Sequence, residues 1–285
     1  MKSRLTGLLP RGLLPNGLRN AGLAGVLGSI LWHGAATAQA PVPVESHYEL
    51  YAGGLQIADV KTGIEMGPRS YQVHLAYHTT GLVNLFSRGV NDTTVTGVWQ
   101  GNMAQPTDWH AQGSWRGDPR LADIAFVAGM PVVRQLDPAD AQERGPVPNS
   151  LKAGSIDTLS AMIDLLREAT LARRCDLSDR TFDGHRIIQF VSRTVGPETL
   201  GPYRGSWFTG STLRCDFTGT PIAGMKTGDS ADARPFRGSI WIASPVAGAP
   251  PIPVRMAFQT RWFGDAVMYL MQAQAAPGLL VAGAH

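Results

Sequence analysis

The two cysteines are the side chains whose chemistry the sequence constrains most. Cys175 and Cys215 are the only cysteines and lie 40 residues apart. In an oxidising compartment a lone pair of this kind most simply forms a disulfide, and closing a loop of that length contributes on the order of 3–4 kcal/mol. Two weaker alternatives stay open. A metal site needs further ligands at suitable spacing, and a redox pair normally takes the form C-x-x-C.

No catalytic motif stands out along the chain. The nearest approach to the G-x-S-x-G turn of serine hydrolases is residues 228–232 (GDSAD), which lacks the second glycine. Asp183, His185 and Arg186 are close in sequence and could hold a general acid or base, but polar residues flanking a hairpin turn explain them more simply. We therefore assign no catalytic residue, and we favour a non-enzymatic role while leaving enzymatic activity open.

The histidines do not predict a metal or cofactor site. His74 and His78 fall on the same face of a predicted strand, but four residues of strand span roughly 13 Å, too far to share a metal. Three others are scattered singly, at His47, His110 and His185. The chain also lacks the zinc motif H-E-x-x-H, the P-loop and the dinucleotide-binding glycine motif. We assign no metal ligand and expect no cofactor.

The tryptophans are more suggestive of binding. Trp99, Trp109 and Trp115 lie within one short region of the chain. An antiparallel sheet that curls can enclose an apolar cavity, and aromatic side chains lining such a cavity would suit a lipid or another apolar ligand. Ordinary core packing is the competing and commoner interpretation of the same residues.

Residues 1–38 have the pattern of a secretory signal peptide. The first 20 residues carry four basic side chains and no acid, at Lys2, Arg4, Arg11 and Arg19. An apolar run over 21–32 and a small-x-small triplet at 36–38 follow, which predicts cleavage between Ala38 and Gln39. The triplet 38–40 also fits, but it would place Pro41 directly after the cut, which suits a peptidase poorly.

Export would deliver the chain to the periplasm of a two-membrane bacterium or to the outside of the cell. The apolar run of about 12 residues is shorter than the roughly 20 that span a bilayer, so we expect no stable membrane span after cleavage. An uncleaved N-terminal anchor stays an alternative if 21–38 act as one apolar segment. Residues 39–45 are expected to form a flexible leader and 275–285 a tail.

The charge of the chain changes once this segment is removed. The formal net charge of +3 includes the four positive charges of the first 20 residues, so the remainder carries a net charge of −1. A nucleic-acid-binding protein would show a clustered basic face, and docking on anionic lipid by net charge would need an excess of Lys and Arg. The composition therefore argues against both modes of binding.

The residue pattern predicts an α+β, mainly β protein with one domain over residues 46–274. With 33 glycines, 20 prolines and 16% charged residues, the composition favours short strands and turns. Period-two alternation predicts strands at 46–52, 58–64, 71–77, 91–100, 103–115, 121–127, 132–136, 180–182, 185–194, 213–218, 237–243, 252–262 and 266–273. Helical spacing predicts one main helix over about 155–170 with Ser155 as its N-cap. We expect a curved antiparallel sheet or open barrel with that helix packed on it.

Several short motifs in a fixed order resemble those of the exported bacterial proteins grouped as domain of unknown function 3108. They are residues 48–53 (YELYAG), 157–160 (DTLS), Cys175 followed by 182–186 (FDGHR), Cys215, and 253–255 (PVR). The resemblance extends over about 45–270 and implies an exported, mostly β protein, with no catalytic residues to carry over. The layout is also similar, at the level of fold, to the periplasmic lipoprotein carriers.

We therefore expect a non-enzymatic periplasmic protein that binds an apolar or envelope-derived ligand, such as a lipid, in the concavity of a curved sheet. One alternative is a hydrolase that acts on envelope polymers, which would need titratable groups converging in a cleft. Another is an envelope scaffold, which would show an exposed apolar patch of several hundred Å². Nucleic acid is not an expected partner, and the sequence leaves the oligomeric state open.

Overall fold

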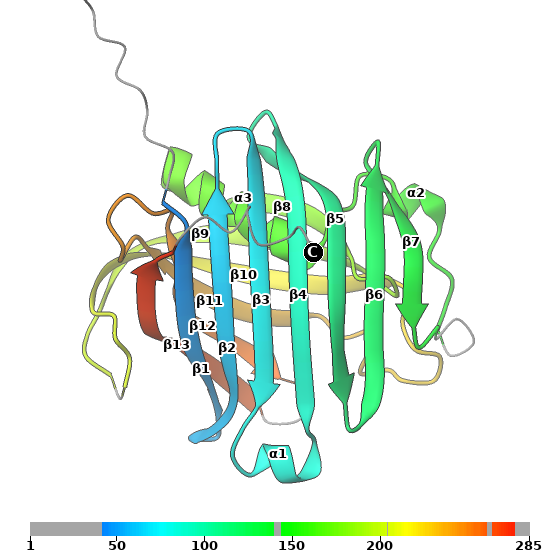
Figure 1. Ribbon diagram of the computed structural model, residues 1–285, viewed down its shortest axis with the longest axis horizontal. Coiled ribbons are helices and arrows are strands. Elements are labelled where there is room, and N and C mark those ends of the chain that lie inside the picture. The colour runs from blue at the N-terminus through cyan, green and yellow to red at the C-terminus, as the bar shows by residue number, and fades with distance from the viewer. Residues whose placement is uncertain (1–41, 140–143, 204, 261–263, 277–285) are drawn as a thin grey trace, which may run out of the picture. The chain divides into compact units, whose positions relative to one another are not determined.

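The computed structural model describes residues 42–139, 144–203, 205–260 and 264–276 (Figure 1). The signal segment with its Ala38–Gln39 cleavage site, residues 39–41 of the leader and the tail from 277 lie outside these residues. The described residues form a mainly β fold with three helices, so the expected fold class is confirmed. The helices are α1 (Val83–Phe86), α2 (Asn149–Lys152) and α3 (Thr158–Ala172).

Thirteen strands form one antiparallel sheet that curls into a nearly closed barrel. In spatial order they run β7-β6-β5-β4-β3-β2-β1-β13-β12-β11-β10-β9-β8. Their bounds are β1 Val44–Ala52, β2 Leu55–Met66, β3 Ser70–Thr79, β4 Gly89–Gln100, β5 Met103–Trp115, β6 Asp118–Val127, β7 Met130–Asp137, β8 Leu177–Phe182, β9 Ile187–Leu200, β10 Gly210–Ala223, β11 Phe236–Ala243, β12 Ile252–Thr260 and β13 Gly264–Ala275. The strands β1 and β13, from opposite ends of the described chain, pair along their full length.

The alternation that predicted the strands also decides which side chains face inward. In β3, Tyr71 and Val73 are buried, whereas His74 and His78 lie on the outer face beside carboxylates of neighbouring strands. The predicted hairpin between β1 and β2 turns at two glycines. Gly53 and Gly54 adopt positive φ angles of 56° and 81°, which two-residue hairpin turns require. In β3 the alternation therefore gives an apolar row on the inside and a polar row on the outside.

The segment that leads into α3 lies across the gap between the two edge strands. The Gly154 N–H donates to the carbonyl of Gly129 in the β6–β7 turn, at 2.8 Å. Two residues later Ile156 makes a parallel bridge to Thr181 of edge strand β8. Because this connection hydrogen-bonds on both sides, it covers polar backbone groups that an open sheet edge would expose.

Three local expectations need correction. The N-cap of α3 is Asp157, whose Oδ1 accepts the N–H groups of Leu159 and Ser160, both at 2.9 Å. Ser155 is not the cap because its hydroxyl donates to the carbonyl of Lys152, at 2.7 Å. The stretch 137–154, for which the sequence predicts no helix, contains α2, and β9 and β10 run well beyond the predicted 185–194 and 213–218.

Candidate functional site: an apolar cavity beside helix α3

A cavity of ≈ 510 Å³ lies between α3 and the inner face of the sheet. Its walls come from β1, β2, β3, β12, β13 and one face of α3, and include Tyr48, Val60, Leu75, Met162 and Met268. A second cavity of ≈ 280 Å³ lies along another part of α3, against β8 to β12. The two share four lining residues, namely Thr158, Met162, Met256 and Phe258.

Among the residues that the structure describes, none that lines the larger cavity has a charged side chain. Its polar groups are threonine hydroxyls and two tyrosines, and burial raises the pKa of Tyr48 to about 12 and also raises that of Tyr77. Both phenols are therefore neutral at physiological pH. The smaller cavity contains one carboxyl group, Asp179, whose pKa is raised by burial. The combined surroundings favour an apolar occupant and offer little to a charged one.

Helix α3 is held against the sheet by a buried polar chain. The fully buried Asp157 accepts a hydrogen bond from the Ser160 hydroxyl, whose oxygen lies 2.6 Å from that of Tyr71 on β3. Tyr71 can lie across β4 because residue 97 is glycine; a Cβ there would come within 2.3 Å of the Tyr71 ring. These contacts position the N-terminal turns of α3, which form one side of both cavities.

Two further contacts fix the middle of α3. The backbone N–H of Ala104 on β5 donates to a carboxyl oxygen of Asp164, and burial is the main cause that raises the pKa of Asp164 to about 7. One helical turn later the Arg167 guanidinium stacks 4.0 Å from the centre of the Trp99 ring. Because α3 is anchored on its β4–β5 side by these residues, its other sides are free to border the cavities.

The three tryptophans proposed as cavity lining occupy different places. Trp115 lines the larger cavity and is 38% exposed at the end of β5. Trp99 packs against Tyr71 and Arg167, and its Nε1 donates to the Gly67 carbonyl. Trp109 is partly buried and packs against two separate clusters of buried hydrophobic side chains.

Most of the lining was not singled out from the sequence. It comes from the inward rows of β1 to β3 and β12, and from Leu159, Met162 and Ile163 of α3. The period-two and helical patterns marked these residues as buried. That signal cannot separate a residue that lines a cavity from one that packs in a solid core.

The cysteine sulfurs lie at disulfide distance, and the Cα atoms of Cys175 and Cys215 are 6.1 Å apart. Both side chains are fully buried. Cys175 follows α3 directly, while Cys215 lies in the middle of β10. A bond between them would join the end of the helix to the sheet that surrounds the smaller cavity.

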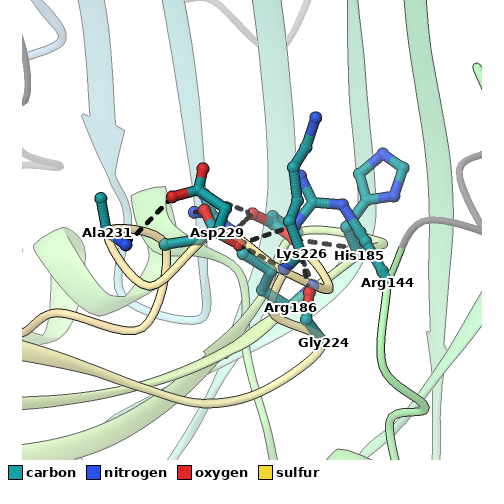
Figure 2. Close-up of polar contacts among 9 residues, drawn as sticks. Arg144, His185, Arg186, Gly224, Lys226, Asp229 and Ala231 are labelled. Atoms are coloured by element: carbon teal, nitrogen blue, oxygen red, sulfur yellow. Dashed lines mark hydrogen bonds and ion pairs between the residues drawn. The ribbon is translucent and has the colours of Figure 1, made fainter.

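The residues considered for acid–base chemistry form a polar network on the β8–β9 turn. The Asp183 carboxylate accepts the backbone N–H groups of His185 and Arg186, and Arg186 also reaches the buried Asp232 at 3.4 Å. Asp232 in turn accepts from Arg144 at 3.2 Å (Figure 2). These contacts supply hydrogen-bond acceptors to backbone N–H groups of the turn and pair the buried carboxylate of Asp232 with arginines. They agree with the simpler interpretation of the sequence, in which these residues are polar groups flanking a hairpin turn.

The near-match to a serine-hydrolase turn is part of this network. Within 228–232, Asp229 caps the Ala231 N–H at 3.0 Å, Asp232 accepts the Lys226 N–H at 2.8 Å, and Ser230 is exposed. The segment is a loop ahead of β11 and does not form the strand-to-helix elbow that such a nucleophile requires.

Within the described ranges, no three His, Cys, Asp or Glu side chains gather closely enough to hold a metal ion. His47 and His78 instead lie 3.0 Å and 3.6 Å from carboxylate oxygens of Asp59, and His74 lies 2.9 Å from one of Asp92. Among the helices that the structure describes, none is both long and apolar enough to cross a membrane.

Fold and site together define a class: a nearly closed antiparallel β-barrel with a helix against its inner face and apolar cavities beside that helix. A family model described as "Protein of unknown function (DUF3108)" matches residues 47–271. The chain belongs to this family, which confirms the resemblance noted in its motifs. None of the curated proteins matches the chain in sequence.

Solved structures add support at the level of the fold. The chain is similar to a β-barrel-like protein of domain of unknown function DUF1849 from Brucella abortus, with 12% identity and a TM-score of 0.51 over 84% of this chain and 100% of that one. It also matches a putative outer membrane lipoprotein-sorting protein domain from Vibrio parahaemolyticus, with 9% identity over 84% of this chain and 87% of that one. The TM-score of the second match is 0.23, which is too low to support a shared fold.

Proposed function

We propose that this chain is an exported cell-envelope protein that holds an apolar ligand, such as a lipid acyl chain, in the cavity beside α3. The observation that carries the proposal is the cavity of ≈ 510 Å³, whose described lining residues are all uncharged. Its volume lies in the range of small-molecule sites, which is roughly 300–1,000 Å³. Voids in ordinary protein cores are much smaller, because side chains there pack about as densely as organic crystals.

The shape of the space favours a long, flexible ligand over a compact one. The two cavities share Met162 and Met256, and unbranched methionine side chains adapt readily to irregular apolar partners. A chain of methylene groups could run from the larger cavity past these residues into the smaller one. Asp179 would then meet the far end of the ligand, where a neutral hydroxyl or a protonated amine would suit it better than a carboxylate.

A pair of neighbouring substitutions tests ligand binding directly. Leu75 lines the cavity, while the adjacent Ala76 lies on the outer face of β3 beside His74 and Lys61. Leu75→Trp should fill the cavity and weaken binding of the fluorescent fatty acid cis-parinaric acid by at least tenfold. The control Ala76→Trp should leave its affinity unchanged. Equal affinity in both variants, or no saturable binding by the unsubstituted protein, would refute the proposal.

Native mass spectrometry of the protein, purified from its own envelope fraction without detergent, would identify the molecule that occupies the cavity. We expect a co-purifying lipid or other apolar molecule, released on unfolding and depleted in Leu75→Trp. The export part of the proposal is tested separately by the intact mass. The periplasmic form should lack residues 1–38, whereas retention of Met1 in a cytosolic form would contradict it.

A further inference from the structure

The end of the barrel near the larger cavity carries an exposed apolar lip, formed by Leu82, Leu85 and Phe86 in and beside α1. These side chains are 61%, 74% and 81% exposed, and no residue of α1 is buried. Figure 1 shows α1 projecting beyond the strands at the β3–β4 connection. Three large apolar side chains this exposed within five consecutive residues are costly in water unless another apolar phase covers them.

The lip is continuous with the cavity. Val83, the next residue after Leu82, lines the cavity, and so does the partly exposed Trp115. Trp115 pairs with Gly89, the first residue of β4, which lies three residues after the end of α1. An apolar path therefore leads from the exposed side chains of the lip to the cavity walls.

Basic groups flank the lip. Arg88 and Arg116 are both exposed, and the Arg116 Nε donates to the Ser87 hydroxyl at 3.0 Å while its backbone N–H donates to the Arg88 carbonyl at 2.8 Å. Neither guanidinium pairs with a carboxylate of the described residues. The start of β6 adds the acid Asp118 and, two residues later, Arg120, so positive charge is in excess around the lip.

We propose that this lip docks the protein on a phospholipid bilayer that contains anionic lipid, with the cavity mouth facing the membrane. Leu82, Leu85 and Phe86 insert among the acyl chains, while Arg88 and Arg116 lie at the level of the phosphates. Insertion of apolar side chains supplies most of the binding, and local arginines orient it, so a near-neutral net charge is no obstacle. The inference rests on the proposed function, since docking would bring the cavity to its source of ligand.

The size of the lip favours a membrane over a protein partner. Stable protein–protein interfaces bury about 1,200–2,000 Å² in total, far more than a four-residue helix with its flanking residues supplies. A bilayer needs no complementary surface, because acyl chains adapt to each inserted side chain. A second copy of the chain and a protein partner are therefore treated as outcomes of the test.

The test is flotation of the purified protein with vesicles of phosphatidylethanolamine and phosphatidylglycerol. Leu85→Ser/Phe86→Ser should bind at least roughly tenfold more weakly than the unsubstituted protein. The matched control is Val127→Ser/Leu171→Ser, which removes two apolar side chains that are 61% and 55% exposed, away from α1. All variants carry the same N-terminal segment, so a difference in vesicle binding between them reflects the substituted side chains and not that segment. Arg116→Gln should weaken binding to these vesicles more than binding to pure phosphatidylcholine.

Several results would overturn the proposal. One is equal vesicle binding by both double variants; another is no vesicle binding by the unsubstituted protein. A third is a loss of self-association in Leu85→Ser/Phe86→Ser with vesicle binding unchanged, which would assign the lip to contacts between copies. Binding of cis-parinaric acid without vesicles separates the two proposals. If that binding is intact while docking fails, the cavity function stands and only the membrane contact is wrong.

Discussion

A covalent bond between Cys175 and Cys215 makes a strong prediction about stability. The perturbation is reduction of this bond, or its removal in the double variant Cys175→Ala/Cys215→Ala. Both cysteines are fully buried, and the loop between them contains all of β8 and β9. Edge strand β8 pairs with only one neighbouring strand, so this part of the barrel depends most on an additional constraint.

The magnitude follows from the loop length. A separation of 40 residues gives about 4 kcal/mol of stabilisation from the lost entropy of the unfolded chain. For a chain of this size 1 kcal/mol corresponds to roughly 2–4 °C in Tm. Reduction should therefore lower the Tm by about 8–16 °C, a change well outside the error of a thermal scan.

The assay is equilibrium urea unfolding with and without reductant, so that the buried bond is reached through the unfolded state. The unsubstituted protein should lose about 4 kcal/mol when reduced. The double alanine variant should be insensitive to reductant, which controls for other effects of the reagent. The bond is absent if reductant leaves the unfolding free energy of the unsubstituted protein unchanged and both thiols react with an alkylating agent in the unfolded, unreduced protein.

Two further predictions concern the anchoring of α3. Asp157→Ala removes the N-cap and leaves the buried Ser160 hydroxyl with one partner fewer, so urea unfolding should show a loss of about 2–4 kcal/mol; a loss below about 0.5 kcal/mol would contradict the anchoring role. Burial holds the pKa of Asp164 at about 7, against an ordinary value of 3.8, so the folded state keeps a proton that the unfolded state releases between these values. The contribution of Asp164 is therefore fully present below about pH 4 and declines by roughly 4 kcal/mol as the pH rises through 7. Asp164→Asn should gain stability relative to the unsubstituted protein from pH 4 to pH 8, and a constant difference across that range would refute the assignment.

The sequence alone determined the features that depend on local periodicity. Alternation in 71–77 indicated that Tyr71 and Val73 face the core and that His74 and His78 face outward, and the structure has them so. Helical spacing identified α3, although its start was placed too early because Ser155 and Asp157 are both good N-cap residues. Only the three-dimensional position of the Leu159 and Ser160 N–H groups distinguishes between them. The order of short motifs along the chain was sufficient to suggest the family.

The cavity and its lip were decided by tertiary structure. Periodicity tells which side chains share a face, but the free space between facing rows depends on how far the sheet curls and where α3 rests. Asp164 and Arg167 hold α3 on the β4–β5 side of the interior, and the space toward β1 to β3 stays open as a result. The same reason places Trp115 at the cavity and Trp99 under α3, although both belong to one cluster in the sequence. A one-dimensional pattern carries the direction of each side chain, whereas a volume arises only when distant segments meet.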